Sequence, residues 1–180
     1  MTRYVAFLRA INVGGHNVKM ERLRALFEAL RFGNVETFIA SGNVLFDSSS
    51  TATSAMETRI ERHLEKHLGY AVATFIRPLA TLASVVGGHP FDTFEQAGHA
   101  LSIGFLKHPV ATADISRLTA LETGYDEFHL RACEVYWLCH GKMSDSKAWG
   151  TALDKALGGP ATFRNITTVR KLAAKATPGQ

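Results

Sequence analysis

Cysteine is scarce in this 180-residue chain, and long apolar runs are missing. The two cysteines, Cys133 and Cys139, lack metal-type spacing, so we expect two reduced thiols and no disulfide framework. No apolar run is long enough to span a bilayer, and the opening MTRYVAFLRA lacks the length and cleavage site of a signal peptide. We therefore expect a cytoplasmic protein with no membrane partner.

Familiar nucleotide, hydrolase and metal motifs are missing too. The glycine pair in RAINVGGHNVKM matches neither G-x-x-x-x-G-K-[ST] nor G-x-G-x-x-G, and no G-x-S-x-G is present. His63 and His67 in HLEKH are not an H-E-x-x-H pair and have no apparent third ligand, so we expect no metal. SDSK (144–147) has S-x-x-K spacing without its partner motifs, and Ser144 or Ser146 is expected to cap a helix instead.

Acidic residues are missing from both ends of the chain. Residues 1–20 carry a net charge of +3 and residues 155–180 carry +5, which leaves −4 for residues 21–154 within the total of +4. If the two ends meet in space, they form one basic patch that would attract an anionic partner. The alternative is that each of these lysines and arginines is simply solvated.

Apolar residues make up 46% of the chain, enough to fill a core, and their spacing predicts a β-α-β-β-α-β order in the first half. Strands are expected at 3–8, 35–40, 43–47 and 71–76, with a helix from Met20 that ends at Gly33 in a left-handed cap and a second helix that stops at Gly69. Gly42 is expected to take positive φ in a two-residue hairpin turn, and a Ser or Thr of SSSTATS to cap the second helix. This order is the split βαβ, ferredoxin-like pattern.

The second half repeats the pattern less cleanly. The predicted elements are a connecting helix at 79–86, a strand at 100–107, a helix at 112–122, a hairpin at 127–140, a helix at 146–159 and a strand at 161–163. Asn165 is expected to cap a final helix. The predicted fold class is α+β, with two ferredoxin-like halves built on antiparallel sheets plus a C-terminal helix. The expected domains are residues 1–78, residues 79–163, and a helix and tail at 164–180.

The glycine pair Gly14-Gly15 stands between a strand and a helix, which exposes backbone N–H groups toward an anion. Taken alone, the stretch is better interpreted as a tight turn, because paired glycines are common in turns. SGN (41–43) is likewise explained as a hairpin turn, and it gains functional weight only if it lies beside the first loop.

Together these motifs resemble the bacterial family catalogued as domain of unknown function 1697. Its signatures are of the types R-G-I-N-V-G-G-x-N, S-G-N-V-x-F and T-x-R-N-x-x-T-V-x-K-L, and this chain carries RAINVGGHN, ASGNVLF and FRNITTVRKL, with EVYWLCHGK and SDSK before the last. Ala10 replaces a glycine of the family type, which argues against a need for positive φ there, and Ile166 replaces a tryptophan. The resemblance implies two ferredoxin-like halves and no assigned activity.

The resemblance also joins the motif residues into one candidate ligand-binding set. It comprises Arg9, Asn12, Gly14, Gly15, Asn17, Ser41, Asn43, Lys147, Arg164 and Asn165. Arginine and asparagine suit phosphate, carboxylate or nucleobase edges, and the set contains no acid. Lys147 is included because a cation at a helix start is unexpected unless an anion is present.

The main hypothesis is a protein that binds an anionic small molecule, such as a nucleotide, or a nucleic acid in a basic cleft lined by glycine, asparagine and arginine. Proton-transfer catalysis needs a tuned base, and His16 is the one candidate near the motifs. Two alternatives stay open. One is an enzyme that acts on a phosphorylated metabolite with His16 or Lys147 as acid or base, and the other is an interaction module without a ligand. Catalytic residues and cofactors are not indicated.

Overall fold

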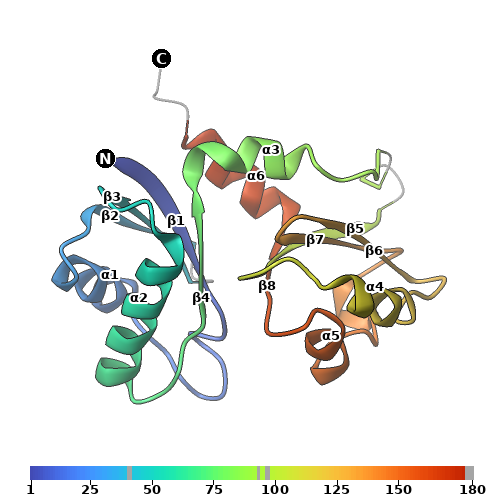
Figure 1. Cartoon of the computed structure of the whole chain (residues 1–180), viewed down its shortest axis with the longest axis horizontal. Coiled ribbons are helices and arrows are strands. Elements are labelled where there is room, and N and C mark those ends of the chain that lie inside the picture. The colour runs from blue at the N-terminus through green and yellow to red at the C-terminus, as the bar shows by residue number, and fades with distance from the viewer. Residues whose placement is uncertain (40–41, 93, 96–97, 177–180) are drawn as a thin grey trace. The chain divides into compact units, whose positions relative to one another are not determined.

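The computed structural model describes residues 1–39, 42–92, 94–95 and 98–176, and the chain divides into two compact units. The first unit is Met1–Thr81 with the chain end that begins at Lys175, and the second is Leu82–Ala174. Each contains one four-stranded antiparallel sheet with helices between its strands (Figure 1), which confirms the α+β class. The domain boundaries expected at 78 and 163 stay predictions.

The first unit follows the predicted β-α-β-β-α-β order. Its elements are β1 (Thr2–Leu8), α1 (Met20–Ala29), β2 (Gly33–Phe38), β3 (Asn43–Ser48), α2 (Thr53–Leu68) and β4 (Thr74–Pro78), followed by the short 3-10 turn η1 (Leu79–Thr81). The strand order across the sheet is β2-β3-β1-β4, and every neighbouring pair is antiparallel. The first strand therefore lies inside the sheet, between the third and the fourth, as the ferredoxin-like pattern requires.

Helices α1 and α2 cover one face of the first sheet (Figure 1). Alternate residues of β1, such as Tyr4 and Ala6, point to that face and pack in one buried core with Phe27 of α1 and Ile60 of α2. Gly69 ends α2 with a φ of +83°, the left-handed cap expected there.

The second unit repeats this order after a leading helix. Its elements are α3 (Leu82–Val86), β5 (Ala100–Phe105), α4 (Thr112–Thr119), β6 (Asp126–Arg131), β7 (Glu134–Cys139), the 3-10 turn η2 (Met143–Asp145), α5 (Thr151–Ala156), β8 (Thr162–Asn165) and α6 (Ile166–Ala174). The strand order is β6-β7-β5-β8, the same permutation as in the first sheet. Helix α6 packs against α3 and against strands β5 and β8.

The core of the second unit contains a polar centre. Trp137 is fully buried, and its indole N–H donates to the carboxylate Oδ1 of Asp126 at 2.8 Å. The thiol of Cys139 donates to the same oxygen at 3.3 Å. Burial, with the neighbouring Asp126 carboxylate, raises the pKa of the Cys139 thiol to about 12, so the thiol stays protonated and keeps donating.

Two turn predictions in the first unit are wrong. Helix α1 ends before Gly33, and Arg31, not Gly33, takes the left-handed conformation, with φ at +60°. Leu30 and Phe32 are both buried, so the chain must turn at the residue between them. The β2–β3 turn is longer than two residues, because Phe38 pairs with Asn43. Gly42 does take positive φ, +76°.

The helix expected at 146–159 is much shorter, because Gly150, with a φ of +98°, cannot continue a helix and α5 begins only after it. Lys147 is thus not at a helix start, and neither serine caps α5, since Ser146 Oγ accepts instead from the N–H of Ala148 at 3.0 Å. The serine or threonine cap expected for α2 is also absent, since its cap position is Ala52, without a side-chain hydrogen bond.

Other element ends move by a few residues. Strand β4 begins three residues later than predicted, α4 and β5 end earlier, and the connecting helix at 79–86 divides into η1 and α3. The hairpin around Ala132 is confirmed, with φ at +53° on that residue. The final helix is confirmed with its cap, because the side-chain oxygen of Asn165 accepts from the N–H of Thr167 at 2.8 Å.

Candidate functional site

The loop of residues 9–19, here called the first loop, connects β1 to α1 and is fixed at both of its ends. The backbone N–H of Arg9 donates to the carbonyl of Ala73 at 2.8 Å. Asn12 closes the loop, because its side-chain oxygen accepts from the N–H of Val18 at 2.8 Å. Ile11 and Val18 are buried in the core of the first unit. The loop is therefore a defined structure in which Asn12 has a conformational role.

Tyr70 supports the first loop from the α2–β4 connection. Its hydroxyl donates to the carbonyl of Ile11 at 2.8 Å, and its ring stacks on the imidazole of His16 with centroids 3.7 Å apart. Partial burial raises the pKa of this hydroxyl, so it stays a donor at neutral pH. Our reading of the sequence missed Tyr70. The one available signal was its position after Gly69, where a helix ends and the chain returns to the sheet.

The middle of the first loop is exposed and left-handed. Gly14 and Gly15 have φ values of +69° and +86°, and no atom lies within 4 Å of where a Cβ would stand on either residue. His16 and Asn17 are exposed beside them. Ala10 also has positive φ, +58°, so the inference drawn from its replacement of glycine is wrong, since the backbone there is left-handed after all.

The β2–β3 turn lies beside the first loop, which is the condition set for its functional interpretation. The N–H of Leu8 donates to the carbonyl of Gly42 at 2.8 Å, and a Cβ on Gly42 would stand 2.7 Å from Ile11. Asn43 is fully buried, and its side-chain N–H donates to the carbonyl of Phe38 at 3.0 Å, which closes the turn. Ser41 lies outside the described residues.

The remaining candidates belong to the second unit. Lys147 is exposed between η2 and α5. Arg164 is 9% exposed on β8, where it donates to Thr162 Oγ1 at 2.9 Å and to the carbonyl of Phe163 at 2.8 Å. Burial lowers the pKa of its guanidinium to about 10, which still leaves it charged at neutral pH. Asn165 caps α6 through its side-chain oxygen. The motif residues thus divide between two units.

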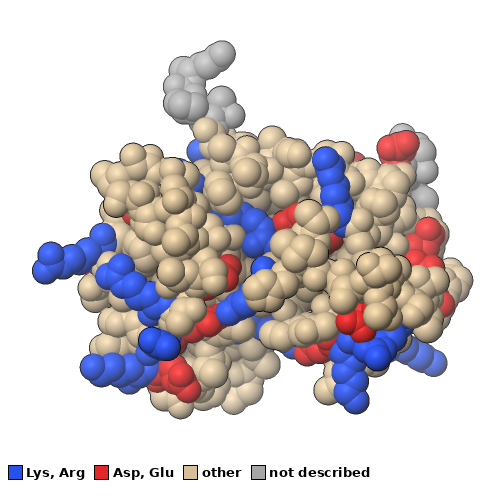
Figure 2. Space-filling view, in the orientation of Figure 1, with Lys and Arg blue, Asp and Glu red and all other residues tan. Residues whose placement is uncertain are grey.

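Three of the eight basic side chains at the ends of the chain form ion pairs with acids. Arg3 contacts Asp47 at 3.1 Å and Glu36 at 3.5 Å, and the Nζ of Lys175 lies 2.5 Å from Glu36. Arg170 pairs with Glu95. On the face drawn in Figure 2, basic and acidic side chains lie interspersed. Part of the charge surplus at the chain ends is therefore neutralised by neighbouring acids.

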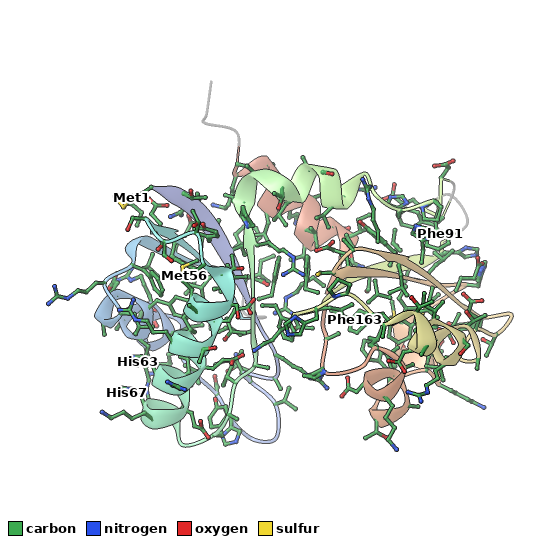
Figure 3. All side chains as sticks on the ribbon, viewed as in Figure 1. Met1, Met56, His63, His67, Phe91 and Phe163 are labelled. Atoms are coloured by element: carbon green, nitrogen blue, oxygen red, sulfur yellow. The ribbon has the colours of Figure 1, made fainter. Side chains whose placement is uncertain are left out.

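His63 and His67 lie one turn apart on α2 (Figure 3), with ring centroids 4.2 Å apart. Within the described residues, no group of three or more His, Cys, Asp or Glu side chains is arranged to hold a metal ion. The cysteines form no disulfide in that part of the chain. Among the helices described, none has the length and apolar character needed to cross a membrane.

Comparison with known proteins gives a family and a fold. A search of solved structures finds the conserved bacterial protein SP0830 from Streptococcus pneumoniae, 23% identical, with a TM-score of 0.76 over 98% of this chain and 99% of that one. At this identity the likeness shows the fold alone. Comparison with curated proteins finds no match. A family model described as "Protein of unknown function (DUF1697)" matches residues 1–136, and the chain therefore belongs to the DUF1697 family.

Proposed function

We propose that this protein binds a phosphate-bearing ligand, a nucleotide or a single-stranded nucleic acid, through the first loop. The observation that carries the proposal is the pair Gly14-Gly15, left-handed, exposed and with open space in front of both residues. Backbone N–H groups in such a turn can face an anion with no side chain in the way. No acid occurs in residues 1–20, so no carboxylate of this segment opposes an anion.

The anchors of the loop favour binding because they hold it in one shape before a ligand arrives. Asn12 and Tyr70 fix its two sides by hydrogen bonds, and Ile11 fixes it by burial. A loop that is already ordered loses less conformational entropy when it binds.

His16 favours a nucleotide over inorganic phosphate. Its imidazole is exposed and is already stacked on one side against Tyr70. Nucleobases stack on such rings, and each base–aromatic contact contributes about 1–3 kcal/mol. The participation of Ser41, Asn43, Lys147, Arg164 and Asn165 in the same site stays a prediction.

An aspartate and an asparagine substitution at Gly14 give a matched test. Both side chains tolerate left-handed φ, and they differ in charge but hardly in shape. We expect Gly14→Asp to weaken binding of a labelled mixed-sequence oligonucleotide about tenfold relative to Gly14→Asn, through charge repulsion. Fluorescence anisotropy at low salt measures the difference, and competition with a mononucleotide shows which of the two ligand types is preferred.

Salt dependence provides the second readout. Affinity for a nucleic acid should fall steeply as salt is raised, because counterions are released on binding, whereas a mononucleotide should show a weaker dependence. The proposal fails if wild type binds neither probe at low salt, or if the aspartate and asparagine variants bind equally well.

A further inference from the structure

The two units share one topology, so their connecting loops can be compared. The first loop, between β1 and α1, corresponds to residues 106–111, between β5 and α4. Residues 69–73, which lead from α2 to β4, correspond to residues 157–161, which lead from α5 to β8. Each unit therefore has the same pair of loops at the same place in its own sheet.

In the first unit, an aromatic side chain occupies the space between these loops. Gly69 takes the left-handed conformation at the end of α2, and the next residue, Tyr70, places its ring against His16 and its hydroxyl on the carbonyl of Ile11. The ring also packs against the apolar core of that unit. Tyr70 thus fills this site from within the chain.

In the second unit, the same two loops line a cavity of ≈ 250 Å³. Lys107, His108 and Pro109 come from one loop, and Gly158, Gly159 and Pro160 come from the other. The buried side chains of Leu106 and Leu157 line it as well. The cavity is smaller than the roughly 300–1,000 Å³ typical of sites for drug-sized ligands, which suits a single ring.

The residue that corresponds to Tyr70 explains the cavity. Gly158, two residues after α5, has a left-handed φ of +72°, as Gly69 has one residue after α2. When these two left-handed glycines are matched, Gly159 corresponds to Tyr70. No atom lies within 4 Å of where a Cβ would stand on Gly159. Where the first unit has a tyrosine ring, the second has a glycine and open space.

We propose that this cavity binds a small molecule with a phenol-like ring, seated as Tyr70 is seated in the first unit. His108 and the two prolines offer flat surfaces to the ring, and the two leucines offer apolar contact. The carboxylate of Asp114, which also lines the cavity and is paired with Arg117, can accept a hydrogen bond from the ring hydroxyl. The site is independent of the first loop, so either proposal can fail without the other.

The test uses p-cresol, the side chain of tyrosine as a free molecule, and 4-methylcyclohexanol as its non-aromatic control. In NMR titrations of the full chain, p-cresol should shift the amide signals of residues 106–114 and 157–161 and bind several-fold more tightly than the control, since ring contacts contribute about 0.5–1.5 kcal/mol. Shifts dispersed over the surface, or equal binding of both molecules, would overturn the proposal.

Four variants sharpen the test. Gly159→Tyr should fill the cavity from within the chain and abolish p-cresol binding. Gly159→Ala places a Cβ on the same backbone conformation but leaves the cavity open, so it should retain binding. His108→Ala should weaken binding by about two- to tenfold, as loss of one ring contact requires, and the exposed His129→Ala should not. If Gly159→Tyr does not fold, the comparison of His108→Ala with His129→Ala tests the proposal instead. Equal p-cresol affinity in these two variants would contradict binding in the cavity.

Discussion

The two units have the same strand order but stabilise their cores differently. In the first, aromatic rings pack on one another, with Phe46 5.7 Å from Tyr4 and 4.4 Å from Phe32 between ring centroids. In the second, the largest buried side chain, Trp137, is tied by a hydrogen bond to the buried carboxylate of Asp126. One topology can thus be built with or without a hydrogen bond from its largest buried ring to a buried carboxylate. The hydrogen-bonded core of the second unit requires both Trp137 and Asp126, because a buried polar group that loses its partner is destabilising.

The backbones of the units differ as well. Among the described residues, non-glycine positive φ occurs at four positions of the first unit, Ala10, Arg31, Asn34 and Ile39, but only at Ala132 in the second. Such conformations cost about 1–3 kcal/mol each and persist only where the surrounding structure imposes them. The first unit therefore contains more left-handed non-glycine residues than the second. Glycine meets the same need in the second, at Gly150 and Gly158.

The largest expected effect tests the polar core. Trp137→Ala should lower the free energy of unfolding by about 3–5 kcal/mol for the lost ring and by about 1–3 kcal/mol more because Asp126 loses a donor. Phe46→Ala, its counterpart in the first unit, should lower the free energy of unfolding only by the amount due to the lost ring, about 3–5 kcal/mol. Urea unfolding followed by circular dichroism measures both. Equal losses would show that the hydrogen bond to Asp126 adds nothing.

A smaller effect is expected from the central strands, where each unit has a small residue facing its helices, Ala6 and Gly104. A Cβ on Gly104 would stand 2.5 Å from the ring of Phe163 and 2.6 Å from Val135. Gly104→Ala should therefore destabilise by about 1–3 kcal/mol through overpacking. Ala6→Gly should cost about 0.5–1 kcal/mol through chain entropy. Thermal unfolding compares the two, and a neutral Gly104→Ala would contradict the tight fit.

Helix caps provide a third contrast. Asn165 caps α6, whereas the cap position of α2 is Ala52, which makes no side-chain hydrogen bond. Asn165→Ala should cost about 1 kcal/mol, and Ala52→Asp should add up to about 1 kcal/mol, because the new carboxylate can accept from the first turn of α2. Urea midpoints should move in opposite directions. A stabilising Asn165→Ala would refute the cap.

The smallest effect is a pH dependence with one histidine in each unit. Burial, reinforced by the neighbouring His67, Lys66 and Arg59, lowers the pKa of His63. A histidine with a lowered pKa binds fewer protons in the folded state than in the unfolded state, so stability is lost as pH falls below about 6.5. His63→Gln should make the fall in melting temperature between about pH 7 and about pH 5 shallower. An unchanged pH profile contradicts this.

His89 is the corresponding case in the second unit, with different neighbours. Burial and Arg170 lower its pKa, while the acids Asp92 and Glu95 oppose the shift. His89→Gln should act in the same direction as His63→Gln. If the melting temperature of the His89 variant falls more steeply with falling pH than that of the wild type, the inference that burial lowers the pKa of His89 is contradicted.

The element order was predictable from the sequence because apolar periodicity is a local property. The stripe that includes Ile60 and Leu64 specified α2 and its end at Gly69, and the hairpin around Ala132 was equally plain. The turns were not predictable where the burial of flanking residues sets the backbone conformation, as at Arg31 between the buried Leu30 and Phe32. Near Gly150 a single positive φ ended a helix pattern that looked continuous.

The candidate site was predictable in part. The contact between the first loop and the β2–β3 turn follows from strand pairing, which the sequence pattern anticipates. Tyr70 lies far along the chain from its partners Ile11 and His16, and no motif connects them. Asn12, Asn43 and Asn165 were grouped as ligand contacts, yet each makes a local hydrogen bond that fixes a loop, a turn or a helix start. Side chains suited to ligands suit backbone groups equally well.

The strand order has a consequence for synthesis on the ribosome. Because the first strand of each sheet lies between the third and the fourth, a sheet is complete only when its last strand has emerged, at Pro78 for the first unit and Asn165 for the second. At about 5–20 residues per second, the interval between these two points is about 4–17 s. The first unit can thus close its sheet, and seat Tyr70 beneath the first loop, while the second is still being translated.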